Sequence, residues 1–125
     1  MISYIGGKAR ISKWIVPYIP KDIETYVESF SGMFWVFFKM NLDEYPNLNT
    51  VVYNDFNGLN SNLFRCCKEY DRMWDEMSRY PCQQLGVEDT PEVYTEMFNQ
   101  YQQEVFHSGV TITEENRFEI AAKYV

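Results

Sequence analysis

Residues 1–77 alternate between helical and extended patterns, and this alternation limits the folds available to the chain. Two short runs rich in β-branched and aromatic residues, 25–30 (TYVESF) and 50–55 (TVVYND), are bounded by turn-forming residues and predict strands. Apolar residues at helical spacing predict a helix over 9–19 and another within 56–77, a segment that begins with turn formers, while the apolar run 34–40 predicts a third. A helix between two strands is typical of a parallel sheet, because parallel strands need a crossover connection. The sequence therefore predicts an α/β fold.

The same spacing predicts which side chains each element buries. The run 34–40 (FWVFFKM) is apolar nearly all round, so we expect a buried helix packed on the sheet, and we expect 25–30 to be a buried strand. The first helix carries its apolar side chains at Ile11, Trp14, Ile15 and Tyr18. The helix over 56–77 carries them at Leu59, Leu63, Cys66, Tyr70 and Met73.

Residues 78–125 show a different, helical organisation. Thr90 and Pro91 have the pattern of a capping residue followed by proline at the first helical position. Thr111 and Glu114 have capping-box spacing and predict a second helix start. This last helix has no stop signal before Val125, which favours a longer natural chain. The two expected apolar stripes are Val93, Met97, Tyr101 and Val105, then Phe118, Ala121, Ala122 and Val125.

Length and charge restrict the function further. A chain of 125 residues with 46% hydrophobic residues supports one small core. The net charge of −7 argues against strong nucleic-acid binding by this chain alone. The charge is unevenly distributed, however, because acids dominate from Glu69 onward, whereas cations gather in the first stretch. A polyanion would therefore approach the N-terminal part, at Lys8, Arg10, Lys13 and Lys21.

The cysteines predict neither a disulfide framework nor a metal site. Cys66 and Cys67 are adjacent, Cys82 lies far from them, and His107 is the single histidine. Zinc sites need spaced ligand pairs, and disulfide scaffolds need an even count. No apolar run approaches the roughly 20 residues of a membrane span, and cations interrupt the first apolar stretch where a signal peptide would lie. We therefore expect a cytoplasmic protein.

The segment Gly6-Gly7-Lys8 raises the possibility of a phosphate-binding loop. A Walker A loop requires the pattern G-x-x-x-x-G-K-[ST]. Here Ile2 occupies the position of the first glycine, and Ala9 occupies the position of the hydroxyl that binds magnesium. No G-x-G-x-x-G fingerprint occurs elsewhere. Both common nucleotide-phosphate loops are therefore excluded.

A second nucleotide-type pattern lies at the ends of the two predicted strands. The first strand leads into Glu28, Phe30 and Gly32, and the second ends at Asp55. Ligands of open α/β sheets bind beyond the carboxyl ends of the strands. A glycine there lets a cofactor lie against bare backbone, and an acid can accept hydrogen bonds from ribose hydroxyls. An equally simple interpretation makes Gly32 a turn glycine and Asp55 a helix cap or turn former.

Three motifs in order carry a family resemblance: Tyr-x-Gly-Gly-Lys, then Tyr-Val-Glu-x-Phe-x-Gly, then Asn-Asp-x-Asn. Over most of the segment 1–70 the chain resembles Dam-like, adenine-specific DNA methyltransferases, enzymes also found in restriction-modification systems. The resemblance implies a doubly wound, Rossmann-like methyltransferase sheet, of which this chain holds part, followed by a helical C-terminal segment. It also implies S-adenosylmethionine as cofactor, the exocyclic amine of adenine as the methylated group, and double-stranded DNA as partner.

The resemblance assigns nine cofactor-binding residues. Tyr4 matches an aromatic residue beside the cofactor, Gly6 and Gly7 match the tight loop there, and Lys8 matches a basic residue near the cofactor's carboxylate. Those of the turn after the first strand are Glu28, Phe30 and Gly32. Asp55 matches the acid that holds the ribose hydroxyls, and Phe56 matches a residue close to the adenine ring. The resemblance thus makes residues 1–77 the cofactor-binding part and residues 78–125 the start of the DNA-recognition insertion.

The chain departs from the family pattern at two places. The family turn Glu-Pro-Phe-x-Gly-Gly/Ala reads Glu-Ser-Phe-Ser-Gly-Met here, so that Met33 adds bulk beside the cofactor. The catalytic Asp-Pro-Pro-Tyr motif does not occur in these 125 residues, and no catalytic residue is assigned. We therefore expect no methyl transfer by this chain alone, with the missing strand supplied by a longer chain or a second polypeptide. The alternative is a non-catalytic interaction protein derived from such a methyltransferase.

Overall fold

The computed structural model describes residues 6–80, 91–107 and 109–125. They divide into two compact units: the N-terminal unit ends at Ser61 and the C-terminal unit begins at Asn62. This division falls inside helix α3 (Gly58–Cys67), well before the functional boundary that the sequence predicts after residue 77. The functional division itself stays a prediction, because compactness does not report on cofactor or DNA binding.

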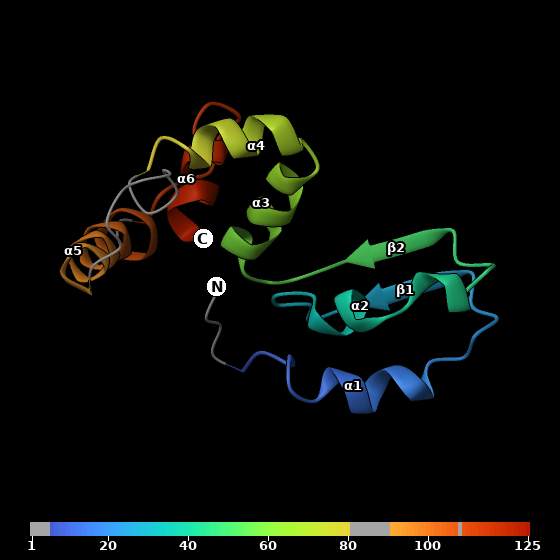
Figure 1. The fold of residues 1–125 in the computed structure, drawn as a ribbon. Helices are drawn as coiled ribbons and strands as arrows, with labels where there is room; N and C mark the ends of the chain where they lie inside the picture. The colour runs from blue at the N-terminus through green and yellow to red at the C-terminus, as the bar shows by residue number, and fades with distance from the viewer. Residues whose placement is uncertain (1–5, 81–90, 108) are drawn as a thin grey trace. The chain divides into compact units, whose positions relative to one another are not determined.

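The N-terminal unit contains a parallel pair of strands, as the sequence predicts. β1 (Thr25–Glu28) pairs with β2 (Thr50–Tyr53) in a register that places Tyr26 opposite Val51 and Glu28 opposite Tyr53. Helix α2 (Trp35–Lys39) lies between them in the chain (Figure 1). Both strands end earlier than predicted, and the residue after β2, Asn54, bonds to the turn after β1 instead, where its carbonyl oxygen accepts from the Ser31 N–H. A two-stranded sheet is shown here, while the doubly wound sheet stays a prediction.

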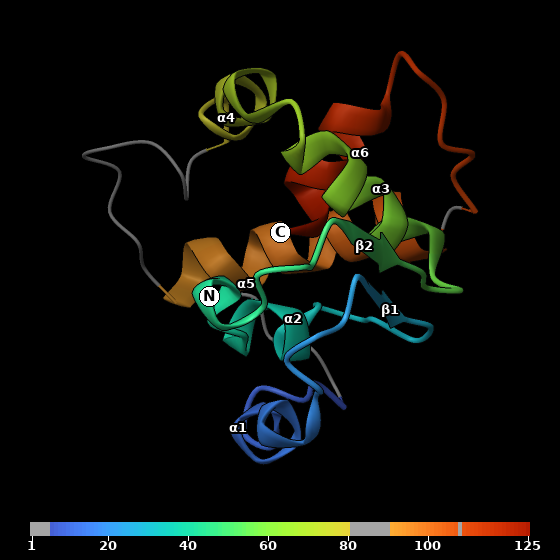
Figure 2. The same cartoon turned by 90° about the vertical axis from the view of Figure 1, so that its right-hand side faces the viewer.

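The helix predicted over residues 9–19 is wrong in length. The structure has a four-residue α1 (Ser12–Ile15), continued by the 3-10 helix η1 (Val16–Tyr18), which contains Pro17. α1 lies against α2 in both cartoon views (Figures 1 and 2). The buried residue of α1 is Ser12, whose hydroxyl donates to the Ala9 carbonyl oxygen at 3.1 Å. The expected apolar side is exposed instead, at Ile11, Trp14 and Tyr18.

An aromatic cluster forms the core of the N-terminal unit. Phe34 stacks on Phe37 with ring centres 4.6 Å apart and meets the edge of Tyr53 at 5.1 Å. Tyr26 lies 5.9 Å from Phe37, so α2 covers the face of the sheet that carries Tyr26 and Tyr53. Val27 and Val52, which point to the opposite face, are exposed. The prediction of a buried strand over 25–30 is therefore correct for one face and wrong for the other.

Helix α2 is likewise only partly buried. Val36 lies in the core, whereas Phe38 on the same helix is 59% exposed. A run of apolar residues nearly all round a helix predicted burial on every side. The helix spans five residues and packs against the sheet on one side and α1 on another, which leaves Phe38 uncovered.

The single helix predicted over residues 56–77 is wrong, because two helices occupy this segment. α3 ends at Cys67, and α4 (Tyr70–Met77) begins after Glu69, whose φ of −103° and ψ of 66° are not helical. Because of this break, the positions that face inward on α4 no longer follow the spacing that begins in α3. Leu63, Cys66 and Met73 are buried as predicted, whereas Tyr70 is 68% exposed.

The remaining helices are α5 (Pro91–Tyr101), the π-helix η4 (Gln102–His107) and α6 (Arg117–Tyr124). Pro91 opens α5 as predicted, and Thr90 lies outside the described residues. Val105 is buried and Met97 and Tyr101 are partly buried, while the Val93 side chain is not described. In α6, Phe118 and Ala121 are buried and Ala122 is partly buried, while Val125 is 37% exposed.

The predicted capping box of Thr111 and Glu114 is wrong. The Thr113 N–H donates to Asn116 Oδ1 at 2.7 Å, and the Asn116 N–H donates to Thr113 Oγ1 at 3.3 Å. This reciprocal pair lies slightly further along the chain, and α6 begins only at Arg117. Glu114 forms ion pairs with Arg65 and Arg117 instead. The carboxylate that the spacing assigned to a cap is therefore engaged in tertiary pairing.

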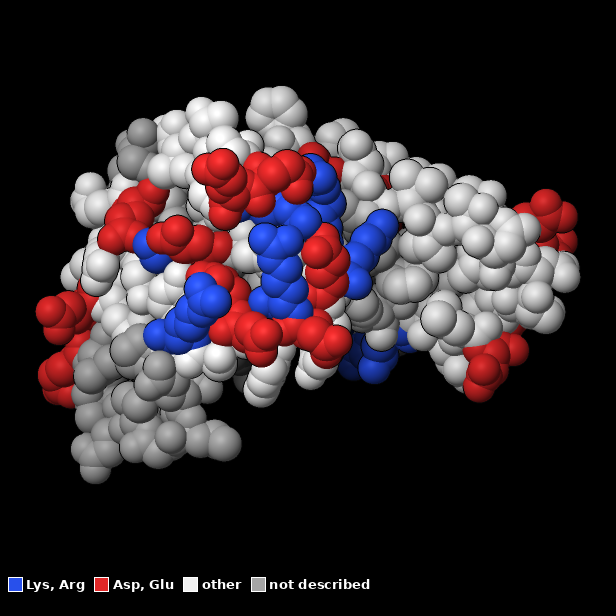
Figure 3. Space-filling model, turned by 90° about the horizontal axis from the view of Figure 1, so that it is seen from above, with Lys and Arg blue, Asp and Glu red and all other residues white. Residues whose placement is uncertain are grey.

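Ion pairs bind the helices of the C-terminal unit to one another. Figure 3 shows a face of the molecule on which cations and acids lie side by side. The paired cations of this unit are Arg65, Arg72, Arg79, Arg117 and Lys123. Burial lowers the pKa of Lys123, but its hydrogen bonds to Glu104 at 2.5 Å and Glu119 at 2.7 Å outweigh this effect and raise the pKa. The clustered cations of this unit are therefore largely neutralised.

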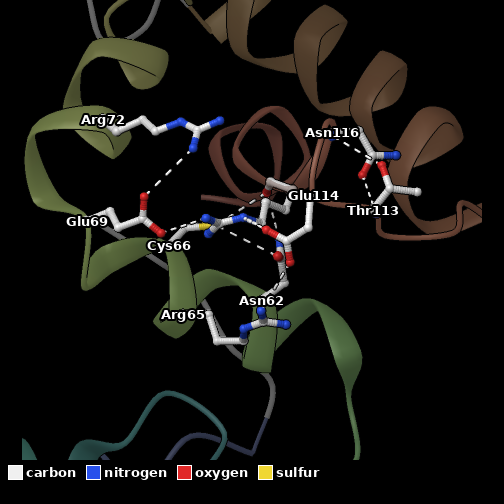
Figure 4. A network of polar contacts seen from close by, with 9 residues as sticks. Asn62, Arg65, Cys66, Glu69, Arg72, Thr113, Glu114 and Asn116 are labelled. Carbon is white, nitrogen blue, oxygen red and sulfur yellow. Dashed lines mark hydrogen bonds and ion pairs between the residues drawn. The ribbon is translucent and has the colours of Figure 1, made fainter.

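Arg117 is the centre of a polar network that joins α3 to α6. Figure 4 shows four members of this network, Asn62, Cys66, Glu69 and Glu114. Its guanidinium donates to Glu69 at 2.6 Å, and its Nε lies 2.8 Å from Glu114 in an ion pair whose angle is unsuitable for a hydrogen bond. Its carbonyl oxygen accepts from the Asn62 amide at 2.7 Å. The buried Cys66 sulfur lies 3.5 Å from the same oxygen, and burial raises the pKa of its thiol.

Phe118 is the apolar partner of this network. Its ring lies 4.0 Å from the Arg72 guanidinium and 4.2 Å from that of Arg117, and only 3% of the residue is exposed.

We expect Phe118→Ala to lower the free energy of unfolding by about 3–5 kcal/mol, since the change removes buried ring area and leaves a cavity. Urea unfolding measures this. The matched control, Phe98→Ala, removes a ring that is 61% exposed and should change stability by about 0.5 kcal/mol or less. Equal effects would contradict the packing described.

The Arg117–Glu69 pair predicts a pH dependence. The hydrogen bond from Arg117 lowers the pKa of Glu69 below its ordinary 4.5, so the pair stabilises the fold above that value. The stabilisation is lost as the pH falls through the lowered pKa, because protonated Glu69 no longer attracts the guanidinium. Arg117→Met should therefore lower the urea midpoint at pH 7 more than at pH 3. Arg79→Met removes a side chain that is 70% exposed and pairs with the partly buried Glu76 three residues before it, so it should have a smaller effect at either pH. If Arg117→Met lowers the urea midpoint equally at pH 7 and at pH 3, the effect of the substitution comes from packing alone.

Candidate functional site

The carboxyl ends of β1 and β2 are joined by a compact set of hydrogen bonds. The Asn54 N–H donates to the Glu28 carbonyl oxygen at 3.0 Å, and the Ser31 N–H donates to the Asn54 carbonyl oxygen at 3.0 Å. The Ser31 hydroxyl, on a residue only 5% exposed, donates to the Glu28 carbonyl oxygen at 2.6 Å. The turn after β1 is therefore attached to the end of β2 at several atoms, and its shape is determined there.

Gly32 lies at the centre of this turn with both of its backbone polar groups bonded. Its φ is +53°, in the left-handed region that favours glycine. Its N–H donates to Asp55 Oδ2 at 2.7 Å, and its carbonyl oxygen accepts from the Tyr53 hydroxyl at 2.7 Å. Phe34, two positions further on, also has a positive φ of 57°, which costs conformational energy in a non-glycine residue. The aromatic stack around Phe34 holds it in this conformation.

Asp55 connects the Gly32 turn to the start of α3. Its Oδ1 accepts from the Asn57 N–H at 2.8 Å and from the Asn60 side-chain amide at 3.2 Å. Desolvation raises the pKa of Asp55, but the hydrogen bonds from Gly32, Asn57 and Asn60, together with the charge of Lys8, outweigh it and lower the pKa. A carboxylate has about four acceptor positions, and three are occupied, so roughly one remains for a ligand.

A cavity of about 190 Å³ lies beside this turn. It is lined by Gly6, Gly7, Lys8, Phe30, Ser31, Gly32, Met33, Trp35 and Asp55. Six of the nine residues that the resemblance assigns therefore lie around one space, although three separate segments of the chain supply them. Met33, the bulky departure from the family turn, is itself one of the lining residues and is 4% exposed.

Of the other three assigned residues, two do not line the cavity and one is not described. The Glu28 carboxylate accepts from the Phe37 N–H at 3.2 Å, in the first turn of α2. Phe56 is 99% exposed and does not line the cavity. Tyr4 lies outside the described residues.

Sequence reasoning missed three residues that shape this site. Ser31 and Tyr53 hold the turn through their hydroxyl groups, and Trp35 lines the cavity. Ser31 lies inside the motif and its hydroxyl was a usable signal. Tyr53 and Trp35 carry none, because an aromatic residue in a strand or an apolar helix has the pattern of a core residue.

The described residues also bear on metal, disulfide and membrane sites. Within the described parts of the chain, no three His, Cys, Asp or Glu side chains are grouped so that they could hold a metal ion. Cys66 is a buried free thiol and Cys67 an exposed one, while Cys82 lies outside the described residues. None of the helices found among those residues has the length and apolar character needed to cross a membrane.

Comparison with known proteins identifies the family. The chain matches the family model of the D12 class N6 adenine-specific DNA methyltransferase over residues 4–124. Modification methylase StsI of Streptococcus sanguinis is 34% identical over 64 residues, which are 51% of this chain and 9% of that protein. Type II methyltransferase M.FokI of Planomicrobium okeanokoites is 36% identical over 56 residues, which are 45% of this chain and 8% of that protein.

These relatives are much longer proteins, since the matched part is less than a tenth of each. No solved structure matches the chain. The family match confirms the resemblance carried by the three motifs, and it extends well beyond the segment 1–70 where those motifs lie. Because it spans nearly the whole sequence, the chain belongs to the D12 class of N6 adenine-specific DNA methyltransferases.

Proposed function

We propose that the N-terminal unit binds S-adenosylmethionine at the cavity beside Gly32, as the methyl-donor part of an enzyme that methylates the exocyclic amine of adenine in DNA. One observation carries this proposal: the segment 6–8, the turn 30–33 and Asp55 line a single cavity. Membership of the family implies the use of S-adenosylmethionine in general. The cavity lies beyond the carboxyl ends of two parallel strands, where α/β sheets bind their ligands.

The residues around the cavity have the chemistry that this cofactor requires. Lys8 would bind the methionine carboxylate as a charge-assisted partner. Asp55, ionised because its pKa is lowered, would accept a ribose hydroxyl at its remaining acceptor position. Gly32 lacks a side chain where the cofactor passes the backbone. When bound, the cofactor supplies an electrophilic methyl group, and the residues named here hold and orient it.

The cavity also limits how the cofactor is held. Its volume of about 190 Å³ is smaller than the roughly 300–1,000 Å³ of typical ligand pockets. The cavity would therefore enclose part of the cofactor. The rest of the cofactor would lie on the open side of the cavity, next to Phe30, which is 81% exposed. Accepting both ribose hydroxyls would require Asp55 to release one of its present donors, Gly32 or Asn60.

Calorimetric titration of S-adenosylmethionine and S-adenosylhomocysteine into the chain of 125 residues tests the site. We expect saturable one-to-one binding, reduced at least about tenfold by Lys8→Met, since a charge-assisted hydrogen bond contributes about 1.5–3 kcal/mol. Asp55→Asn should also weaken binding while it keeps one oxygen acceptor for the neighbouring amides. The control variants are Lys39→Met and Asp43→Ala, which change exposed charges outside the cavity and should bind as the unaltered chain does.

Asp55→Ala is the more severe variant, and its stability must be measured beside its binding. The change leaves the Gly32 and Asn57 N–H groups without their acceptor, which should cost about 1–3 kcal/mol in urea unfolding. Lost binding in a variant that remains folded supports a cofactor role. Full cofactor affinity in folded Asp55→Ala would show that Asp55 is a structural residue only, and the proposed site would be wrong.

The proposal separates donor binding from methyl transfer. The 125 residues contain no Asp-Pro-Pro-Tyr, so we expect them to bind the donor without transferring its methyl group. Transfer of a radiolabelled methyl group to adenine-containing duplex DNA measures this, and the expected signal is that of a reaction without protein. Transfer above that level would show that another group holds the adenine amine.

A non-catalytic interaction role is the second candidate. Exposed apolar side chains in and next to α1 and on the uncovered sheet face favour it, since such surface promotes association. These side chains are Ile11, Trp14, Tyr18, Val27 and Val52. The same titration separates the two candidates, because an interaction protein has no need to retain cofactor affinity.

A further inference from the structure

The N-terminal segment has an unusual charge for this acidic chain. The segment 1–21 contains Lys8, Arg10, Lys13 and Lys21 and no Asp or Glu, although the whole chain carries a net charge of −7. An isolated group of cations in an acidic protein either pairs with acids brought by the fold or stays available to a ligand. The ion pairs of the structure decide between these two possibilities.

Most cations elsewhere are paired. Lys21 pairs with Glu44, and the pairs of the C-terminal unit involve five further cations. Among the described residues, neither Arg10 nor Lys13 forms an ion pair, and both are exposed. Lys8 is also exposed and acts on Asp55 only through its charge. We call Lys8, Arg10 and Lys13 the basic cluster.

The basic cluster adjoins the cavity. Lys8 lines that space, and its carbonyl oxygen accepts from the N–H groups of Ile11 at 3.1 Å and Ser12 at 2.8 Å. This turn brings the segment directly from the cavity wall into α1. Arg10 and Lys13 have i, i+3 spacing across the start of the helix, which places side chains on neighbouring positions. Trp14 beside them is 67% exposed, with the Lys13 ammonium 5.1 Å from its ring centre.

We propose that the basic cluster, through Arg10 and Lys13, is a docking surface for the phosphate backbone of duplex DNA. This inference rests on the proposed function, because the target adenine must leave the duplex and come to the methyl donor. Phosphate contacts position a protein on the duplex without reading its sequence. Two exposed cations next to the donor cavity would hold the backbone on either side of the extruded base, and Trp14 offers a flat apolar surface to a sugar or base.

The test is the salt dependence of duplex binding, because each phosphate contact changes the slope of log K against log salt by about 0.9. Fluorescence anisotropy of a labelled duplex with the unaltered chain gives this slope over a series of KCl concentrations. We expect Arg10→Gln/Lys13→Gln to reduce the slope by about 2, and to weaken binding similarly for duplexes of different sequence. Arg10→Lys/Lys13→Arg keeps both charges and should keep the slope.

The matched control is Lys39→Gln/Lys68→Gln, which removes two other exposed cations that form no ion pair among the described residues. Its slope should equal that of the unaltered chain. The proposal is overturned if the control lowers the slope as much as Arg10→Gln/Lys13→Gln does, if that variant leaves the slope unchanged, or if the unaltered chain does not bind duplex DNA. Equal competition by poly-glutamate and by unlabelled duplex, at matched charge, would also overturn it, since the surface would then be a general anion site.

Titration of S-adenosylmethionine separates this inference from the proposed function. Arg10→Gln/Lys13→Gln leaves the cavity lining intact, so its cofactor affinity should equal that of the unaltered chain. If the unaltered chain binds no cofactor but shows the expected loss of slope, the docking surface stands and the donor site fails. If the cofactor binds and Arg10→Gln/Lys13→Gln leaves the salt slope of duplex binding unchanged, the donor site stands and the docking surface fails.

Discussion

The hydrogen bonds of Gly32 are the constraint on which the N-terminal unit depends. Its N–H bonds to Asp55 and its carbonyl oxygen to the Tyr53 hydroxyl, so the turn after β1 is held by the last residue of β2 and by a residue just beyond it. This fixes where β1 ends, how α2 begins and which residues line the cavity. Asp55 extends the same connection to the start of α3 through Asn57 and Asn60.

This arrangement unites two interpretations of Asp55 that the sequence left open. As a turn former and helix-start acceptor, Asp55 uses three of about four acceptor positions. As a proposed ribose ligand it must use the fourth. The same contacts that lower its pKa also keep it ionised and oriented, so a structural role prepares the carboxylate for a ligand. Stability and binding must therefore be measured together at this position.

The sequence predicted the elements better than their ends or their exposed sides. Both strands and their parallel pairing followed from short patterns, because turn residues and β-branched runs act locally. The six assigned residues that line the cavity came from the family resemblance, since the local patterns left the roles of Gly32 and Asp55 open. The break at Glu69 did not, since nothing in the helical spacing of 56–77 marks it. The capping box at Thr111 failed because Glu114 pairs with two arginines, one of them far away in the chain. The exposure of Trp14 and Phe38 depends on which elements are present to cover them.

By itself, the sequence determined the family, the helix between two parallel strands and the residue types at the strand ends, since these are encoded in contiguous motifs. Only the tertiary structure decided that Ser31, Tyr53 and Trp35 belong to the site and that Arg117 joins α3 to α6. It also decided that Arg10 and Lys13 form no ion pair within the described parts of the chain. The physical reason is the same in each case. Hydrogen bonds and ion pairs form between residues that are far apart in the chain, and a local pattern does not specify which partner the fold brings within about 3 Å.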